Sequence, residues 1–146
     1  MRSGTENMPG IAGFGEAARL ARERFDENLT AVTEVRQAIL AGLRDAVPDA
    51  RLNEPAVHIP HILSLTVPGV KSEVMLNHLS AKGICVSAGS ACSARARNIS
   101  RAMTAFGLTP AEADNTIRVS LCPGNTMEEA AALLSALEEG GKRLRR

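Results

Sequence analysis

The sequence predicts an α/β fold in which a long helix is followed by a three- or four-stranded sheet covered by helices. Apolar residues recur at helical spacing through the first third of the chain. Short stretches of alternating, β-branched character then take turns with helical stretches, and proline, glycine and capping residues separate them. At 146 residues we expect one domain, 1–146, with a helical region at 1–47 and an α/β part at 48–146.

The helical region extends from about residue 11 to residue 46, as one long helix or as two helices end to end. Its apolar positions at helical spacing are Leu20, Phe25, Leu29, Val32, Val35, Ile39 and Leu43. We expect it to end near Val47-Pro48-Asp49, because proline disfavours helical geometry in the residue before it. A short extended stretch and a loop are expected from there to Pro60.

The first strand of the α/β part is expected over residues 61–67, where the chain alternates and Pro68-Gly69 supplies a stop. Residues 71–81 have their apolar side chains on one side, which predicts a helix. That helix should end at Gly83, since glycine adopts positive φ without steric cost. Residues 84–87 are expected to form the next strand.

The remaining elements are predicted mainly by their caps. Residues 98–106 suit a helix, and Thr109-Pro110-Ala111-Glu112 combines a cap, a proline at the first helical position and a reciprocal glutamate. Residues 116–121 alternate as a strand, and a second capping box at Thr126 opens a helix that Gly140-Gly141 is expected to close. This pattern leaves open whether the strands pair in parallel or antiparallel.

Composition and charge argue against several classes of protein. Seventeen Lys and Arg nearly balance sixteen Asp and Glu, so no overall field attracts nucleic acid or an acidic surface. The chain has no Trp or Tyr and only three Phe, which leaves few platforms on which bases could stack. The basic run at residues 142–146 is more typical of a frayed, solvated tail than of a docking signal. We therefore expect no nucleic-acid partner.

The sequence contains no apolar run of membrane-spanning length and no segment resembling a signal peptide, so a cytoplasmic location and no membrane association are expected. The three cysteines are odd in number and are expected to be free thiols in a reducing compartment. Neither the cysteines nor the histidines have the spacing of metal ligands, so no metal site is predicted.

Cys92 lies in the most informative stretch, Gly83-Ile84-Cys85-Val86-Ser87-Ala88-Gly89-Ser90-Ala91-Cys92-Ser93-Ala94-Arg95. Its small residues cannot form a packed core, so a loop is expected after the strand. In such a loop Arg95 and Arg97 would favour the thiolate, which is the nucleophilic form. Composition alone leaves Cys92 as either a nucleophile or a small turn residue. Cys85 is expected to be a small buried thiol, and Cys122 to be incidental.

Four ordered segments resemble the cysteine desulfurase family, in the class whose active-site cysteine lies in a long loop. They are Arg2-Ser3-Gly4-Thr5-Glu6-Asn7 with Gly13-Phe14-Gly15; Pro60-His61-Ile62-Leu63 through Pro68-Gly69-Val70 with Ser72-Glu73; Val86-Ser87-Ala88-Gly89-Ser90-Ala91-Cys92-Ser93; and Ile117-Arg118-Val119-Ser120-Leu121 with Asn125-Thr126 and Glu128-Glu129. Together they span nearly the whole chain, and four motifs in order are far more specific than one.

The resemblance implies the small carboxy-terminal domain of a fold type I transferase that depends on pyridoxal phosphate, within the class V aminotransferases. In that family the cofactor serves as an electron sink, and an enzyme thiolate takes the sulfur of L-cysteine as a persulfide, leaving L-alanine. Cys92 is implied to be that thiolate. Arg118 matches the arginine that holds the substrate carboxylate, the alternative being a strand residue in a surface ion pair. Thr5 matches a residue that reaches the cofactor phosphate of the neighbouring subunit, the alternative being a polar residue near a chain end.

The lysine that would anchor the cofactor is not expected in this chain, because Lys71, Lys82 and Lys142 all lack the family's lysine context. We expect the cofactor domain of the family to precede Met1, and the isolated chain to be inactive without a lysine-bearing domain. The implied partners are L-cysteine, a sulfur acceptor or iron–sulfur scaffold protein, and an amino-terminal cofactor domain or a homodimer. The alternative is a non-catalytic remnant, or a module that dimerises or binds a sulfur carrier.

Overall fold

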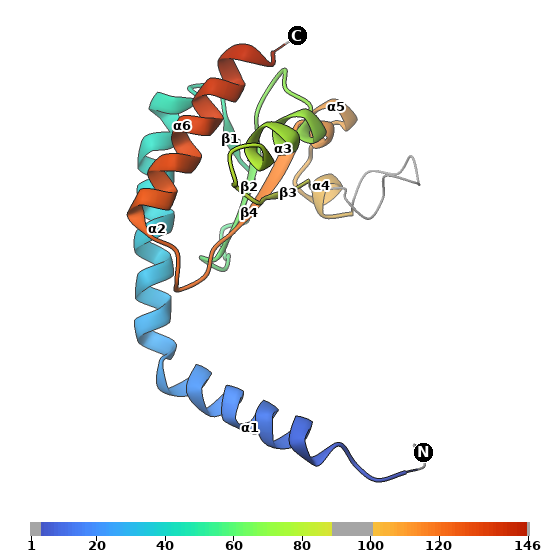
Figure 1. Ribbon diagram of the computed structural model, residues 1–146. Helices are drawn as coiled ribbons and strands as arrows, with labels where there is room; N and C mark the ends of the chain where they lie inside the picture. Colours follow the sequence, from blue (N-terminus) through green and yellow to red (C-terminus); the bar gives the residue numbers. More distant parts are fainter. Residues whose placement is uncertain (1–3, 89–100, 146) are drawn as a thin grey trace.

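The α/β prediction is confirmed by a computed structural model that describes residues 4–88 and 101–145 (Figure 1). The helices are α1 (Met8–Glu23), α2 (Phe25–Ala46), α3 (Ser72–Ser80), α4 (Arg101–Ala105), α5 (Pro110–Asp114) and α6 (Met127–Arg143). The strands are β1 (Arg51–Leu52), β2 (Ile62–Thr66), β3 (Ser87–Ala88) and β4 (Thr116–Ser120). Among the helices of these described residues, none combines the length and apolarity needed to cross a membrane.

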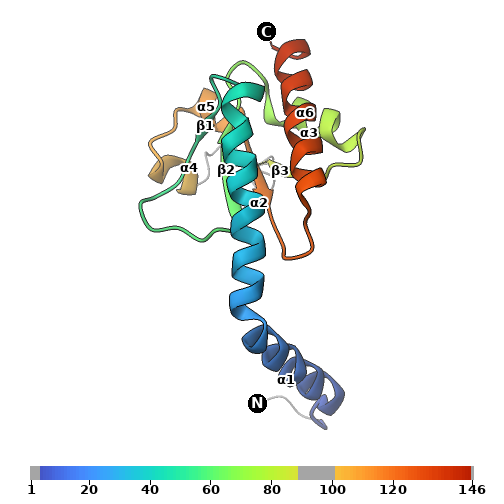
Figure 2. The ribbon, with the colours of Figure 1, turned by 90° about the vertical axis from the view of Figure 1, so that its left-hand side faces the viewer.

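The helical region consists of two helices end to end, α1 and α2, that meet at Arg24. Asn7 caps α1, because its side-chain oxygen accepts a hydrogen bond from the Gly10 backbone N–H at 3.2 Å. The carboxyl-terminal half of α2 packs against α6, whereas α1 has no buried residue and projects away from the sheet (Figure 2). Only α2 therefore contributes a helix face to the core.

The sheet has four strands in the order β1-β2-β4-β3, and every pairing is antiparallel. The antiparallel arrangement settles what the sequence pattern left open. In β4, Arg118 lies opposite Ser64 of β2 on one side and opposite Ser87 of β3 on the other. Since directly paired residues point to the same face of a sheet, these three side chains share one face.

The two faces of the sheet have different coverings. Leu63, Leu65 and Ile117 are fully buried on one face, beneath α2, α3 and α6. The short helices α4 and α5 lie on the other side of the sheet, where Met103, Leu108 and Ala113 form a second, smaller apolar cluster (Figure 1). The second face is consequently only partly covered, and it presents the row that includes Arg118.

The predicted helix starts are confirmed. Thr109 and Thr126 each accept a hydrogen bond from the backbone N–H three residues on, and the carboxylates of Glu112 and Glu129 accept hydrogen bonds from the backbone N–H of these threonines. Gly83 has a φ of +77°, as expected at the end of α3. Residues 98–100 of the helix expected over 98–106 lie outside the described residues, and α4 covers Arg101–Ala105.

The strand expected over residues 84–87 is much shorter than predicted, because β3 contains only Ser87 and Ala88. The Ile84 backbone N–H is used instead to close the end of α3, donating to the Leu79 carbonyl at 3.0 Å. The prediction of a buried Cys85 was also wrong: this thiol is exposed. Residues 84–86 follow the end of α3 and do not pair with any of the described strands. The apolar neighbours Ile84 and Val86 therefore do not bury the Cys85 side chain between them.

The carboxy-terminal end also differs from expectation. Gly140 and Gly141 do not close α6, which continues to Arg143, and both glycines are buried. A Cβ on Gly140 would lie 2.8 Å from Met75 Sδ, so glycine is used here for close packing against α3 rather than to end the helix. The basic run is not frayed throughout: Lys142 and Arg143 pair with Glu138 and Glu139 one turn earlier.

Candidate functional site

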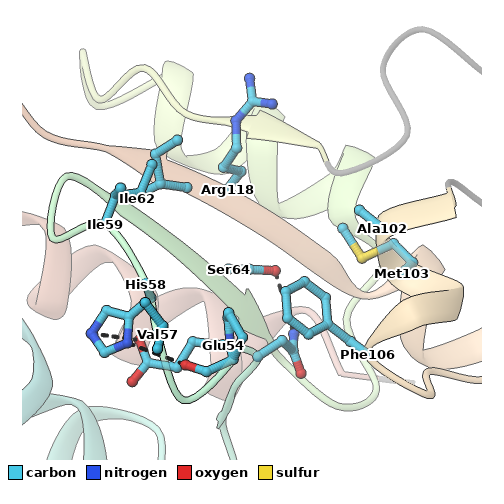
Figure 3. Close-up of a pocket in the computed structure, with 12 residues that line it drawn as sticks. Glu54, Val57, His58, Ile59, Ile62, Ser64, Ala102, Met103, Phe106 and Arg118 are labelled. Atoms are coloured by element: carbon cyan, nitrogen blue, oxygen red, sulfur yellow. Dashed lines mark hydrogen bonds and ion pairs between the residues drawn. The ribbon is translucent and has the colours of Figure 1, made fainter.

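A pocket with a volume of about 510 Å³ lies on the partly covered face of the sheet. It is lined by Asn53, Glu54, Pro55, Val57, His58, Ile59, Ile62, Ser64, Ala102, Met103, Phe106 and Arg118. Figure 3 shows Ala102, Met103 and Phe106 on one side, the residues of the loop before β2 on another, and Ser64 between them. Its lining is mostly apolar, with a few polar groups that could orient a ligand.

Arg118 stands at the edge of this pocket. Its side chain is directed away from Glu54 and His58 (Figure 3), and within the described residues no acid pairs with it. The sequence alternative of a surface ion pair for Arg118 therefore finds no partner in residues 4–88 or 101–145. An exposed guanidinium beside an apolar pocket is suited to a ligand with a carboxylate, because its planar fork can donate two parallel hydrogen bonds.

A buried polar network supports the floor of the pocket. The Asn53 side chain donates to the Thr66 hydroxyl at 2.8 Å, and the Thr66 and Thr116 hydroxyls are 2.7 Å apart. Thr116 in turn donates to the Glu112 carbonyl at 2.7 Å, and both threonines are at most 1% exposed. Because each hydroxyl has a partner, this network fixes Asn53 at the pocket without leaving a buried polar group unsatisfied.

Cys92 lies outside the described residues, as do Arg95 and Arg97. The described residues on either side of that segment both belong to the pocket region. Ser87 and Ala88 pair with Arg118 and Ile117 of β4, and Ala102 and Met103 line the pocket directly. The described residues that flank residues 89–100 therefore lie beside β4 on one side and at the pocket wall on the other.

Thr5 is not brought to this pocket within the chain. It is exposed and precedes α1, which projects away from the sheet (Figure 1). None of the hydrogen bonds or ion pairs found among the described residues involves Thr5.

The chain's lysines also lie away from the pocket. Lys71 Nζ is 3.6 Å from Asp114, Lys82 Nζ donates to Glu139 at 2.6 Å, and Lys142 pairs with Glu138. Hydrogen bonds from Lys82 and Arg143 lower the pKa of Glu139 to about 2. Each lysine is therefore an exposed member of a surface ion pair. Within residues 4–88 and 101–145, no group of three or more His, Cys, Asp or Glu side chains could hold a metal ion.

Sequence reasoning identified Arg118 but missed most of the pocket around it. The contributions of Asn53, Glu54 and His58 come from a loop whose only sequence signal was its prolines. Phe106 and Met103 were assigned to a helix without any indication of the face they would present. The register between β2 and β4 places Ser64 opposite Arg118, and strand alternation alone could not have given that pairing.

Comparison with known proteins finds one family and a consistent set of relatives. Residues 1–133 match the family described as aminotransferase class-V. The chain is 37% identical over 145 residues to the putative cysteine desulfurase IscS 1 of Bacillus subtilis, which covers 98% of this chain and 38% of that protein. It is 33% identical to the cysteine desulfurase IscS of Methanosarcina thermophila, over 99% of this chain and 36% of the relative.

Solved structures agree with this result. A NifS-like protein superposes with a TM-score of 0.79 at 32% identity, over 94% of this chain and 34% of that one. A NifS-like protein from Rickettsia africae gives a TM-score of 0.80 at 30% identity, over 94% of this chain and 36% of that one. The chain thus spans between about a third and two fifths of the length of these relatives.

Proposed function

The chain belongs to the aminotransferase class-V family, and from that premise we propose that it is the carboxy-terminal part of a pyridoxal-phosphate-dependent cysteine desulfurase. In this proposal Arg118 binds the carboxylate of L-cysteine and Cys92 accepts its sulfur. A bond forms between Cys92 Sγ and the substrate sulfur, and the carbon–sulfur bond of the substrate breaks. The electron pair passes to the substrate carbon, which takes up a proton to give L-alanine, and a persulfide remains on Cys92.

The observation that carries the proposal is the position of Arg118. It is an exposed guanidinium without an acidic partner among the described residues, beside a pocket of about 510 Å³ and opposite Ser87 in the sheet. Cys92 follows Ala88 by four residues, and four residues of chain span at most roughly 14 Å. The length of chain between Ala88 and Cys92 is therefore compatible with the proposal that the thiol reaches a substrate held at Arg118.

The described residues do not fit the cofactor as a complete site. A cofactor aldehyde needs a lysine close to the substrate, and all three lysines are paired with carboxylates on the surface, outside the pocket. The proposal assigns the anchor of the cofactor to a separate part of the enzyme, and it assigns Thr5 to the cofactor phosphate of a neighbouring subunit.

Helix α1 leaves apolar side chains exposed, and we propose that a second polypeptide covers them. Met8, Ile11 and Phe14 are 61%, 56% and 78% exposed, and none of the residues of α1 is buried. Apolar side chains along one exposed helix are typical of a surface that another chain or domain covers. The proposed occupants are the cofactor domain or a second copy of this chain. The same observation favours the second candidate function, a module that binds such a partner without catalysing a reaction.

The test is a chimaera in which this chain replaces the matching part of the Bacillus subtilis relative. The fusion is supplied with pyridoxal phosphate, L-cysteine and a thiol reductant, which reduces the persulfide and releases its outer sulfur as sulfide. Alanine and sulfide are then expected in equal amounts. Cys92→Ser is expected to abolish both products, whereas Cys122→Ser, at an exposed thiol, leaves them unchanged. Arg118→Met should raise KM for cysteine about 10- to 100-fold, since a charge-assisted pair contributes roughly 1.5–3 kcal/mol.

Arg118→Lys is the matched control for charge. It keeps the positive charge but loses the fork, so its KM should fall between those of the parent and Arg118→Met. Alanine formation that survives Cys92→Ser would refute the role of the thiol. A fusion that assembles and binds cofactor but yields no alanine would favour the non-catalytic module.

A further inference from the structure

We infer that Arg36 is a positioning residue that fixes the 53–61 loop as the wall of the Arg118 pocket. The 53–61 loop joins β1 to β2, and six of its residues line the pocket, half of the lining set. This inference deepens the proposed function, because it identifies what holds the substrate pocket in shape. The structure of the loop does not itself depend on whether the chain takes part in catalysis.

Arg36 is a buried arginine. It lies on α2, its side chain is only 6% exposed, and its guanidinium points toward the loop rather than to solvent. One nitrogen pairs with the Glu54 carboxylate. The second terminal nitrogen, Nη1, donates to the Ile62 carbonyl at 3.3 Å and to the Pro60 carbonyl at 3.5 Å. The Arg36 side chain thus contacts the loop near both of its ends, at Glu54 close to β1 and at Pro60 and Ile62 at the start of β2.

The loop has little else to hold it between those ends. Val57 and Ile59 are 90% and 51% exposed, so burial of their side chains does not fix the backbone. Backbone hydrogen bonds to other segments occur at the ends, from Asn53 to Ser64 and from Leu121 to His61. For residues 54–60, none of the backbone–backbone hydrogen bonds found in the described part of the chain reaches another element.

Glu54 extends the hold of Arg36 into the pocket wall. Its carboxylate is 27% exposed and lies 3.7 Å from His58 Nε2, and His58 Nδ1 lies 3.2 Å from the Pro55 carbonyl. The contact of Nδ1 with the Pro55 carbonyl is within hydrogen-bond distance, whereas the separation of Nε2 from the Glu54 carboxylate is that of an ion pair. Contacts from Arg36 to Glu54 and from Glu54 to His58 therefore connect α2 to the lining of the pocket.

Removing Arg36 would leave the Glu54 carboxylate and two carbonyls without their donor, and a partly buried carboxylate then turns toward water. The loop would leave its position for part of the time, and a ligand at Arg118 would find a formed pocket less often. If the pocket is formed a tenth as often, the apparent dissociation constant rises about tenfold.

The test uses the 146-residue chain and NMR relaxation of its backbone amides. Residues 56–59 are expected to have order parameters of about 0.85 in the parent and below about 0.6 in Arg36→Met. Glu54→Gln, the milder change, keeps an acceptor for Arg36 and should give intermediate values. Arg36→Lys, which keeps the charge, should recover part of the order. Arg44→Met removes an exposed arginine from the same helix and should change nothing.

A second measurement follows the Arg118 Nε–H signal during titration with propionate, a small carboxylate with an apolar end. Arg36→Met and Glu54→Gln should weaken binding, the former about tenfold or more. Circular dichroism at the same temperature establishes that each variant is folded, so a global loss of structure is not mistaken for a local one.

The two measurements separate the inference from the proposed function. Loop amides that stay as ordered in Arg36→Met and Glu54→Gln as in the parent would overturn the inference. Loop amides that lose order while propionate affinity stays unchanged would also overturn it, because Arg36 would then not position the pocket. A parent chain that binds no propionate would count against the role of Arg118, and the order parameters would still decide whether Arg36 fixes the loop.

Discussion

Replacing Gly140 with alanine is expected to destabilise the protein, even though alanine is the better helix former. Gly140 is buried where α6 crosses α3, and a Cβ there would lie 2.8 Å from Met75 Sδ and 3.1 Å from His78 Cδ2. Met75 is only 1% exposed, so its thioether cannot swing out to solvent. His78 is held by a 3.0 Å contact between its Nε2 and the Ala136 carbonyl. Both neighbours of the new methyl group are therefore confined.

Gly141 provides a matched control one residue further along. It is also buried in α6, but a Cβ there would lie 3.8 Å from Val47, which is ordinary van der Waals contact. Both substitutions gain the helix-propensity difference of about 1 kcal/mol between glycine and alanine. Only Gly140→Ala adds the strain of overpacking, about 1–3 kcal/mol. We expect Gly141→Ala to be up to about 1 kcal/mol more stable than the parent, and Gly140→Ala to be less stable than Gly141→Ala by the overpacking strain.

The assay is urea unfolding followed by circular dichroism, because the chain has no Trp or Tyr to report by fluorescence. Repeating Gly140→Ala in a Met75→Ala background tests the cause, since the strain should largely disappear once the thioether is gone. A Gly140→Ala variant as stable as Gly141→Ala would refute the close-packing explanation.

Three other expectations can be checked with the same protein. Thr66→Val should lower the free energy of unfolding in urea by about 1–3 kcal/mol, because Asn53 and Thr116 would lose their hydrogen-bond partner. Thr30→Val, at an exposed threonine, should change it by less than about 0.5 kcal/mol. Equal effects of the two substitutions would contradict this expectation. Because hydrogen bonds from Lys82 and Arg143 hold the folded-state pKa of Glu139 at about 2, below its ordinary value of 4.5, this carboxylate contributes stability above pH 4.5 that is lost as the pH falls towards 2. Glu139→Gln should therefore flatten the acid limb of a stability–pH curve, and an unchanged limb would count against the pairing. Equimolar pyridoxal phosphate followed by borohydride should leave the isolated chain without a stoichiometric covalent adduct by mass spectrometry, and one full equivalent at any lysine would overturn the assignment of the anchor to another part of the enzyme.

Local signals in the sequence predicted the element boundaries well. The caps at Thr109 and Thr126 and the positive φ at Gly83 are properties of a few consecutive residues, and each occurs as expected. The predictions failed where packing across the chain decides the outcome. Gly140 and Gly141 have the composition of a helix end, yet contact with α3 makes them interior residues. Ile84 looks like a strand residue, but its N–H caps α3.

The candidate site divides in the same way. Arg118 could be singled out from a short motif, because motif residues are neighbours in the chain. The pocket beside it could not, since its walls come from the 53–61 loop, β2 and α4. Arg36 was one charged residue on a helical pattern, and nothing in that pattern indicated that it would be buried against residues 18 to 26 positions further along the chain.

The sequence by itself determined where the capped helices α5 and α6 begin and which residues belong to a family motif, because these depend on side chains close together in the chain. Only the tertiary structure decided that the strands pair antiparallel in the order β1-β2-β4-β3, and that Arg118 stands between Ser64 and Ser87. Strand order and register depend on contacts between distant segments, and a shift of one residue would turn Arg118 to the other face of the sheet.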